Sequence, residues 1–178
     1  MKIIVESDIH GSNYYTQKLV KIIEKEKPDE VILLGDVFYH GPRNKLPKNY
    51  NPMKVAEILN RFANILKCTK GNCDAEVDQM IADFKFEDKI EKTISNKKFL
   101  FTHGHNLDFE NLPAKIDFIF GGHTHISSIK KYGKVTYVNP GSLAIPKEST
   151  KSSFAIIDEK DISIFDIKGK LVGSCKIN

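Results

Sequence analysis

The sequence predicts a single α/β domain that contains two β-sheets. Its 178 residues match the usual size of one domain and are enough to bury a sizeable core. Strand-like and helix-like patterns alternate over the first half of the chain, which is typical of α/β folds. The last thirty residues alternate apolar and polar side chains, as antiparallel strands and hairpins do. No internal repeat, linker or low-complexity segment divides the sequence, so we expect residues 1–178 to form one domain.

Six short apolar runs predict strands, and polar residues follow each of them. In chain order the runs lie at 3–5, 31–34, 65–70, 99–102, 118–120 and 135–138. The sequences that follow them are, in the same order, SDIHGS, GD, GNCD, H, GGHTH and NPGS. Near the end, the segments SFAIID, DISIFDI and LVGSCKI predict three more strands.

The spacing of apolar residues predicts that the segments between the early strands form helices. The apolar residues between 19 and 23 lie on one helical face, and Pro28 ends that helix. Asn51 and Pro52 form a helix start, with an N-cap followed by proline at the first helical position. The apolar stripe at 55–65 continues that second helix, and we expect a third helix near 76–84.

Composition argues against several classes of protein. A net charge of +4 with scattered lysines indicates a solvated surface rather than a nucleic-acid interface. No apolar run approaches the ~20 residues that span a membrane, and Glu6 interrupts the first run too early for a signal peptide. Cys68, Cys73 and Cys175 are an odd number without regular spacing, so we expect no disulfide framework. The sequence therefore predicts a cytoplasmic protein with neither a membrane nor a nucleic-acid partner.

The polar residues that follow five of the strands form a candidate metal site. They are Asp8, His10, Asp36, Asn72, His103, His123 and His125. The carboxyl ends of strands in α/β sheets are where sites form, so these side chains can converge on one crevice. Asp8 and His10 are two residues apart, as are His123 and His125. Since alternate residues of an extended chain point the same way, we expect each pair to bind one centre together.

The donor types indicate the kind of metal. Two carboxylates, an amide and four imidazoles suit Mn, Fe or Zn, and the oxygen share favours Mn²⁺, with Ni also compatible. Seven ligands are too many for one open catalytic ion, but they fit two ions that share a carboxylate. Asp36 is the only acid at its strand end and is our candidate bridge. Taken singly, Asp8, Asp36 and Asn72 could each belong to a simple turn; their joint order favours two ions, which clamp oxygens in phosphoryl hydrolysis.

The ordered motifs also resemble those of a known family. D-x-H, G-D, G-N-C-D, a lone H and G-H-x-H span residues 8–125 and resemble the signature of the calcineurin-like metallophosphoesterases. Further stretches such as SDIHGS, GNCDAEVDQM and NPGS resemble the small single-domain bacterial and archaeal phosphodiesterases of that family. The resemblance implies an αββα sandwich, two facing β-sheets flanked by helices. It also implies a dimetal-dependent phosphodiesterase in which a metal-bridging hydroxide attacks the phosphorus in line.

The resemblance further implies which residue binds which ion. One ion would take Asp8, His10, Asp36 and His125. The other would take Asp36, Asn72, His103 and His123. Asp36 is then the bridge, as the ligand count indicates independently.

Cys73 is the position at which this chain departs from the family pattern, which commonly has histidine there. A thiol with a pKa of about 8.5 is a poor proton donor compared with an imidazole. Our hypothesis is that Cys73 removes an acid near the leaving group and favours phosphodiesters over monoesters. The alternatives are a metal ligand, a nucleophile, a disulfide partner or a residue that only packs beside the site.

Four other residues are candidates for roles near the site. His105 resembles a residue that orients a ligand or contacts substrate. In the loop 37–52, Arg43 could bind a phosphate and His40 could protonate a leaving group, or both could simply order the loop. We expect Asp74 to hydrogen-bond a neighbouring loop or a histidine rather than a metal.

These observations favour an enzyme that hydrolyses small soluble phosphodiesters. The alternatives are a phosphomonoesterase, a nuclease, and a metal-binding scaffold without turnover, since a retromer subunit with a similar fold works as a scaffold. All seven ligands are present, which favours catalysis. The physiological substrate and the metal in the cell stay open. So does the oligomeric state, although the loop 37–52 and the strand-rich end could each join copies in a homo-oligomer.

Overall fold

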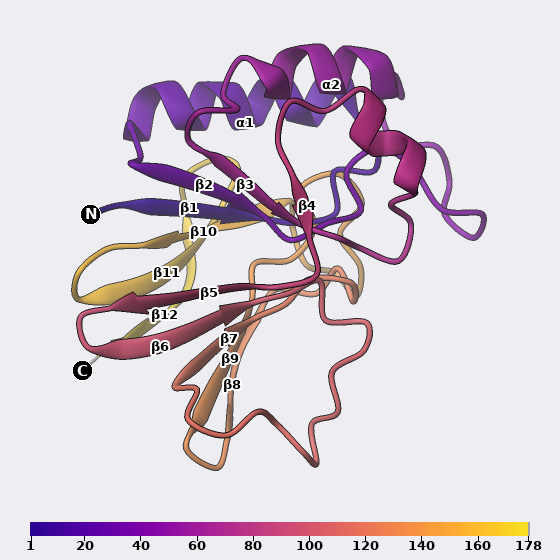
Figure 1. The fold of residues 1–178 in the computed structure, drawn as a ribbon. Coiled ribbons are helices and arrows are strands. Elements are labelled where there is room, and N and C mark those ends of the chain that lie inside the picture. The colour runs from indigo at the N-terminus through magenta and orange to yellow at the C-terminus, as the bar shows by residue number, and fades with distance from the viewer. Residues whose placement is uncertain (178) are drawn as a thin grey trace.

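The computed structural model describes residues 1–177, which fold into two facing β-sheets (Figure 1). The strands of the larger sheet are β1 (Ile3–Glu6), β2 (Glu30–Leu33), β3 (Leu66–Thr69), β4 (Phe86–Glu87), β10 (Ser153–Ile157), β11 (Asp161–Asp166) and β12 (Leu171–Lys176). Those of the smaller sheet are β5 (Ile90–Ile94), β6 (Lys97–Phe101), β7 (Phe118–Phe120), β8 (Ser128–Tyr132) and β9 (Val135–Asn139). The predicted α/β fold with two sheets is confirmed.

The order of the strands brings several carboxyl ends to one edge. The larger sheet has the order β12-β11-β10-β1-β2-β3-β4, in which β1 to β4 are parallel and β10 to β12 form antiparallel hairpins. The smaller sheet has the order β5-β6-β7-β9-β8, in which β6, β7 and β9 are parallel. The carboxyl ends of β1, β2 and β3 therefore lie together, and so do those of β6 and β7.

Two apolar layers hold the sheets and helices together. On the outer side of the larger sheet, Ile4 belongs to a buried cluster with Leu19 of α1 (Asn13–Glu26) and with residues of α2 (Pro52–Asn60). Its neighbours Ile3 and Val5 belong to the cluster between the sheets, which includes Phe99 of β6. This alternation follows from the two-residue period of a strand. Figure 1 shows both α-helices over the larger sheet.

The outer face of the smaller sheet is covered by a loop instead of a helix. Leu107, Leu112 and Ile116 of the segment that follows β6 pack on the cluster that includes Leu100 of β6 and Ile119 of β7. The expected flanking helices are thus found on the larger sheet, while this loop covers the smaller one (Figure 1).

The expectation of a helix at 76–84 is wrong. Only a 3₁₀ turn, Glu76–Met80, forms there, and none of its residues is buried. The side chain of Gln79 bonds the backbone of Ala82, Phe84 and Phe86 and so directs the chain into β4. The second helix also ends earlier than its apolar stripe, at Asn60, whose side-chain amide bonds the backbone at Ile81 and Asp83.

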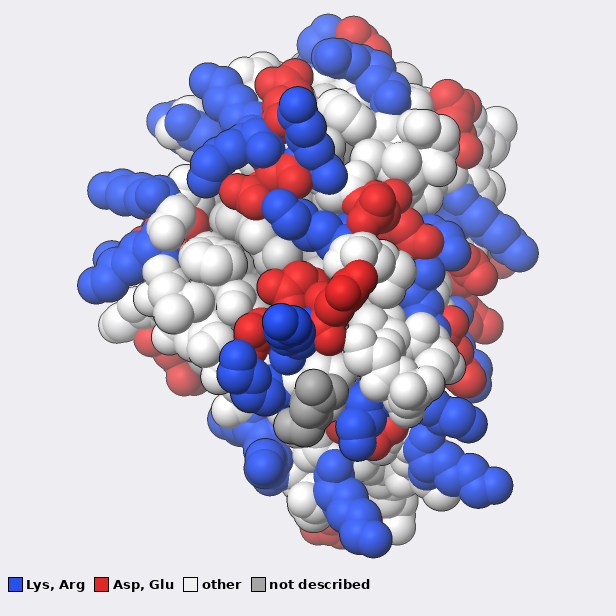
Figure 2. Space-filling model, turned by 90° about the vertical axis from the view of Figure 1, so that its left-hand side faces the viewer, with Lys and Arg blue, Asp and Glu red and all other residues white. Residues whose placement is uncertain are grey.

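The surface combines charges of both signs. Figure 2 shows the face that lies on the left-hand side of Figure 1, and on it Lys and Arg side chains intermix with Asp and Glu. Ion pairs such as Lys2–Glu26 and Lys92–Glu30 join charges of opposite sign. Within residues 1–177, no helix has the length and apolar character needed to cross a membrane. The three cysteines carry free thiols.

Candidate metal centre

All seven predicted ligands lie in loops that follow strands, and the two sheets both contribute. The loops after β1, β2 and β3 hold Asp8, His10, Asp36 and Asn72. The loops after β6 and β7 hold His103, His123 and His125. The side chains meet where the carboxyl ends of the two sets of strands face each other, as sites in α/β folds do.

Most of these residues are not extended, and this corrects one step of the sequence argument. Asp8, His10, Asp36, His123 and His125 have φ angles between 49° and 64°. This left-handed conformation costs about 1–2 kcal/mol for each such residue. It persists because the loops are tied together, for example by His10 N–H to the Asp36 carbonyl at 2.9 Å. Backbone strain of this kind concentrates at functional sites.

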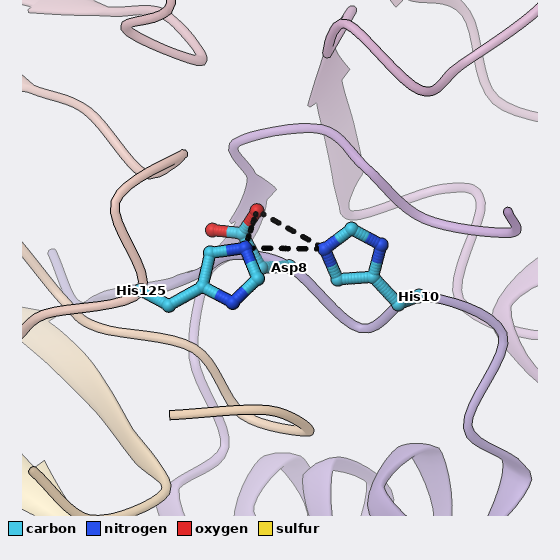
Figure 3. Close-up of side chains that lie close together, drawn as sticks. All are labelled: Asp8, His10 and His125. Atoms are coloured by element: carbon cyan, nitrogen blue, oxygen red, sulfur yellow. Dashed lines mark hydrogen bonds and ion pairs between the residues drawn. The ribbon is translucent and has the colours of Figure 1, made fainter. Parts of the chain in front are cut away.

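The first group of ligands consists of Asp8, His10 and His125 (Figure 3). Asp8 Oδ1 lies 3.5 Å from His10 Nε2 and 3.3 Å from His125 Nε2. The two Nε2 atoms are 3.3 Å apart. Asp8 and His125 are fully or almost fully buried, so this group lies beneath the surface.

The second group lies on the other side of Asp36. His103 Nε2 is 3.1 Å from Asn72 Oδ1, and the rings of His103 and His123 have centroids 5.2 Å apart. His123 is therefore beside His103, while His125 is beside Asp8 and His10. The expectation that His123 and His125 bind one centre together is wrong for this geometry, because His123 lies beside His103 whereas His125 lies beside Asp8 and His10.

Asp36 lies between the two groups. Its Oδ2 is 3.7 Å from His10 Nε2 and 3.5 Å from His103 Nε2. Its Oδ1 accepts a hydrogen bond from the Cys73 backbone N–H at 2.8 Å. One carboxylate thus faces both ligand sets, which is the geometry that a bridging ligand needs.

The protonation of the histidines fits a bound cation. In three rings, Nδ1 forms a hydrogen bond with a backbone carbonyl oxygen. These bonds join His10 to Tyr39 at 2.7 Å, His103 to Leu34 at 2.7 Å, and His125 to Ile145 at 2.8 Å. Because a carbonyl only accepts, these Nδ1 atoms carry protons and the Nε2 atoms of the neutral rings present lone pairs. Asp8 Oδ1 has no hydrogen-bond donor within residues 1–177. Imidazole nitrogens and carboxylate oxygens aimed at one another are a donor set for a divalent ion.

The pKa values of Asp8, His10 and His123 depend on their burial and on the charges of their neighbours in the site. Burial opposes ionisation of Asp8, but its contacts with His10 and His125 lower the pKa of this carboxyl well below the usual value. Burial likewise opposes the charge on His10, but the bond to Asp8 raises the pKa of that ring. Burial lowers the pKa of His123, and the neighbouring His103 lowers it further. His123 is therefore neutral and available as a ligand near pH 7.

Asp74 positions the loops rather than binding metal. Its carboxylate accepts backbone N–H groups from Gly71 at 2.7 Å, Asp36 at 2.7 Å and Val37 at 2.9 Å. Burial raises the pKa of Asp74 to about 6, although these three bonds oppose the shift. The expectation that Asp74 bonds a neighbouring loop is confirmed.

Sequence reasoning missed further residues that hold the ligands. The Ser7 hydroxyl donates to Asp8 Oδ2 at 2.6 Å, and the Ser142 hydroxyl donates to the Asp8 carbonyl at 2.8 Å. A side chain at Gly122 would collide with Ser7 and Asp8. The NPGS sequence that contains Ser142 was the available signal, but hydroxyls are too common to indicate which loop they reach.

A cavity of about 800 Å³ opens beside the centre. It is lined by ligands of both groups and by Tyr39, Arg43, Cys73 and Lys147. Arg43 thus lies beside the ligands, whereas Lys147 was not anticipated. Burial, followed by the negative charge of Asp36, raises the pKa of the Cys73 thiol to about 12, so it stays protonated without metal. Its Sγ and ligand atoms of His10 and Asp36 all lie within 4.8 Å of one another.

The two remaining candidates lie farther from the ligands. His40 does not line this cavity; its ring packs between Tyr39 and Tyr50 at centroid distances of 4.8 and 5.3 Å. His105 is exposed, with its ring centroid 5.3 Å from that of His103 and its Nε2 at 2.9 Å from the Asn106 amide. Neither residue is part of either ligand group.

Comparison with known proteins gives consistent matches. Residues 1–161 match the family model of the calcineurin-like phosphoesterase superfamily domain. The chain is 38% identical over 175 residues to phosphodiesterase YfcE of Escherichia coli (strain K12), covering 97% of this chain and 95% of the relative. It is 29% identical over 151 residues to phosphodiesterase MJ0936 of Methanocaldococcus jannaschii, covering 79% and 83%.

Solved structures agree with the fold. The structure of the E. coli phosphoesterase YfcE superimposes with a TM-score of 0.96 at 35% identity over the whole of both chains. A Vps29 structure from Entamoeba histolytica superimposes with a TM-score of 0.67 at 20% identity, also over both whole chains. The second match shows a shared fold alone.

Proposed function

The chain belongs to the calcineurin-like phosphoesterase superfamily, and we propose that it hydrolyses small soluble phosphodiesters at a centre of two divalent ions. Its activity as a metal-dependent hydrolase of phosphodiesters is that of its family and of its 38% identical relative. The two-ion centre, the role of each residue and the size of the substrate are our proposal. The observation that supports it most is the position of Asp36 Oδ2, which lies within 3.7 Å of the Nε2 atom of a histidine from each ligand group.

Each ion has a proposed ligand set. Asp8, His10 and His125 would hold one ion, and Asn72, His103 and His123 would hold the other, with Asp36 bound to both. The bonds from His10, His103 and His125 to backbone carbonyls fix these rings and make their Nε2 atoms the donors. Ser7 and Ser142 hold Asp8, while Asp74 holds the backbone of Asp36.

The chemistry of the reaction divides between the ions and the protein. When bound, two divalent ions would lower the pKa of the water that they hold, so that it can act as a nucleophile at neutral pH, and would neutralise charge on the phosphoryl oxygens. The protein orients the substrate: Arg43 and Lys147 line the cavity beside the centre and pair with non-bridging phosphoryl oxygens. Their fixed positive charge attracts the negative charge that the phosphodiester already carries when it binds.

Cys73 sets the preference for diesters in this proposal. Its thiol lines the same cavity and, with its raised pKa, does not donate readily to a poor leaving group. A diester with a good leaving group needs little protonation. A monoester with a poor leaving group needs an acid that this position does not supply.

Mn²⁺ is the metal that we propose, because three of the seven donors are oxygens and none is a thiolate. Fe, Zn and Ni would also bind this mixed set. A cytoplasmic location and a homo-oligomer are predictions of the sequence alone.

A two-substrate assay tests the function. The protein is stripped with chelator, supplied with Mn(II), and assayed with bis-p-nitrophenyl phosphate and p-nitrophenyl phosphate. We expect metal-dependent turnover with a strong preference for the diester. Preferred turnover of the monoester would retain the enzyme and overturn the proposed preference for diesters. Tight metal binding without turnover of either substrate would make a scaffold function, the second candidate for this fold, the better explanation.

A further inference from the structure

A second cavity, of about 390 Å³, adjoins the metal centre at Gly71 and His105. Gly71 is the neighbour of the ligand Asn72, and the His105 ring lies beside those of His103 and His123. None of the residues that line this cavity lines the 800 Å³ cavity that holds Arg43 and Lys147. The centre is therefore flanked by two separate spaces, and a diester has two arms to place.

This second cavity is built where the two sheets meet. Lys70 follows β3, and its backbone N–H bonds the Glu87 carbonyl of β4 at 2.7 Å. Lys89 lies between β4 and β5, and Leu100 lies on β6. Leu107, from the loop after β6, packs on the same apolar cluster as Leu100 and completes an apolar floor.

The charged residues at this cavity are not equivalent. Lys89 Nζ is 2.7 Å from Glu91 Oε1, so its charge is compensated. Asp88 also lines the cavity and contributes a negative charge. Lys70 takes part in none of the ion pairs found within residues 1–177, and its side chain is only partly exposed. The cavity therefore presents an apolar floor together with the Lys70 ammonium group and the Asp88 carboxylate, neither of which forms an ion pair within residues 1–177.

We propose that this cavity binds the ester arm that the substrate retains, and that this arm is apolar or aromatic beside the phosphorus and anionic at its far end. Cys73 stands at the position implied to face the leaving group, and it lines the larger cavity. The leaving arm therefore lies in the larger cavity, and the retained arm extends past His105 towards Lys70. This inference rests on the proposed phosphodiesterase function and adds the class of substrate.

Three p-nitrophenyl diesters that differ only in the second arm test the proposal. The second arms are methyl, phenyl and 4-carboxyphenyl, and the measured quantity is kcat/KM for release of p-nitrophenol with Mn(II). The wild-type protein should prefer 4-carboxyphenyl to phenyl and phenyl to methyl. Lys70→Ala should lower kcat/KM about tenfold for the carboxyphenyl diester alone, as the loss of one charged contact does. Leu107→Ala should lower it about threefold for both aromatic arms relative to methyl.

Controls separate this proposal from the proposed function. Lys85→Ala removes an exposed lysine near β4 that does not line the cavity, and it should leave the three values unchanged. The product 4-carboxyphenyl phosphate should inhibit the wild-type protein more than phenyl phosphate does, and Lys70→Ala should abolish that difference. Equal loss for all three diesters in Lys70→Ala would overturn the inference and leave the diesterase intact. No turnover of any diester by the wild-type protein would overturn the proposed function, and the inference with it.

Discussion

The Nε2 atoms of His10 and His125 lie 3.3 Å apart although both rings donate their Nδ1 protons to backbone carbonyls. Neutral rings in this arrangement bring two lone pairs together beside the Asp8 carboxylate. Without a cation the arrangement is costly, and the bond to the Asp8 carboxylate raises the pKa of His10. A divalent ion relieves it better, because it binds both nitrogens and the carboxylate at once.

Metal binding should therefore stabilise the fold. We expect Mn(II) to raise the melting temperature of chelator-stripped protein, with a gain of about 2.7 kcal/mol at a free metal concentration one hundred times Kd. Asp8→Asn should reduce this gain, since it removes the charge that faces both imidazoles. Asp83→Asn, at an exposed aspartate remote from the ligands, is the matched control and should keep the full gain. Identical melting curves with and without Mn(II) would contradict the metal centre.

Asp74 should be important for stability even without metal. Asp74→Asn leaves one acceptor oxygen for three backbone N–H groups and places an amide N–H against a donor. We expect a loss of about 2–4 kcal/mol in the free energy of unfolding of the metal-free protein, measured by urea denaturation. Asp78→Asn, which affects one exposed bond to Ala75 N–H, should cost about 1 kcal/mol or less. Equal losses in the two variants would show that Asp74 does not hold the loops.

The sequence was most informative where the order of motifs mattered. Asp8, Asp36 and His103 come from three different strand ends, and their convergence follows from parallel strands having their carboxyl ends on one side. The inference that partners two residues apart share a centre failed for His123 and His125, which face different ligand groups, although Asp8 and His10 do lie together. Left-handed residues depend on bonds from neighbouring loops, and the motif itself does not contain those bonds.

Other features depended on distant parts of the chain. The 3₁₀ turn at Glu76–Met80 replaces a helix because the Gln79 side chain satisfies backbone groups as far away as Phe86. Lys147 reaches the site because its backbone N–H bonds the His125 carbonyl at 3.2 Å, which folds the loop after Ser142 over the centre. A local pattern cannot reveal a bond between residues that are distant in sequence.

Acid should weaken the turn after β11 through Asp166. Its buried Oδ1 accepts N–H groups from Lys168 at 2.9 Å and Lys170 at 3.0 Å. The Lys170 bond is the main cause of a pKa lowered from its usual value, so this contribution is complete above about pH 4 and is lost as pH falls through the folded-state pKa. Asp166→Asn should cost about 1 kcal/mol at pH 7 and less as the pH falls below about 4, measured as the free energy of unfolding. A cost that is the same at both pH values would contradict this account, and Asp83→Asn again serves as control.

Lys147 should contribute to substrate binding rather than to the fold. Its backbone bonds remain in Lys147→Ala, while the ammonium group leaves the cavity beside Arg43. We expect KM for bis-p-nitrophenyl phosphate to rise about tenfold, with a smaller change in kcat and an unchanged melting temperature. Lys151 is an exposed lysine of the same loop, and its side chain does not line the cavity. Lys151→Ala should therefore leave KM unchanged. A fall in melting temperature without a change in KM would assign Lys147 a structural role instead.

Cys73→His should change which phosphate esters the enzyme accepts. The thiol at this position is held protonated with a pKa of about 12, and an imidazole would add a donor that titrates near neutrality. General acid catalysis typically contributes about 10²–10⁴-fold. The ratio of turnover of an alkyl monoester, whose alkoxide is a poor leaving group, to turnover of bis-p-nitrophenyl phosphate should therefore rise by at least about tenfold. Cys73→Ser, which keeps a small side chain without an imidazole, is the matched control and should leave the ratio unchanged. If the ratio stays constant in Cys73→His while metal binding is retained, Cys73 only packs beside the site. The preference for diesters must then arise from the shape of the two cavities.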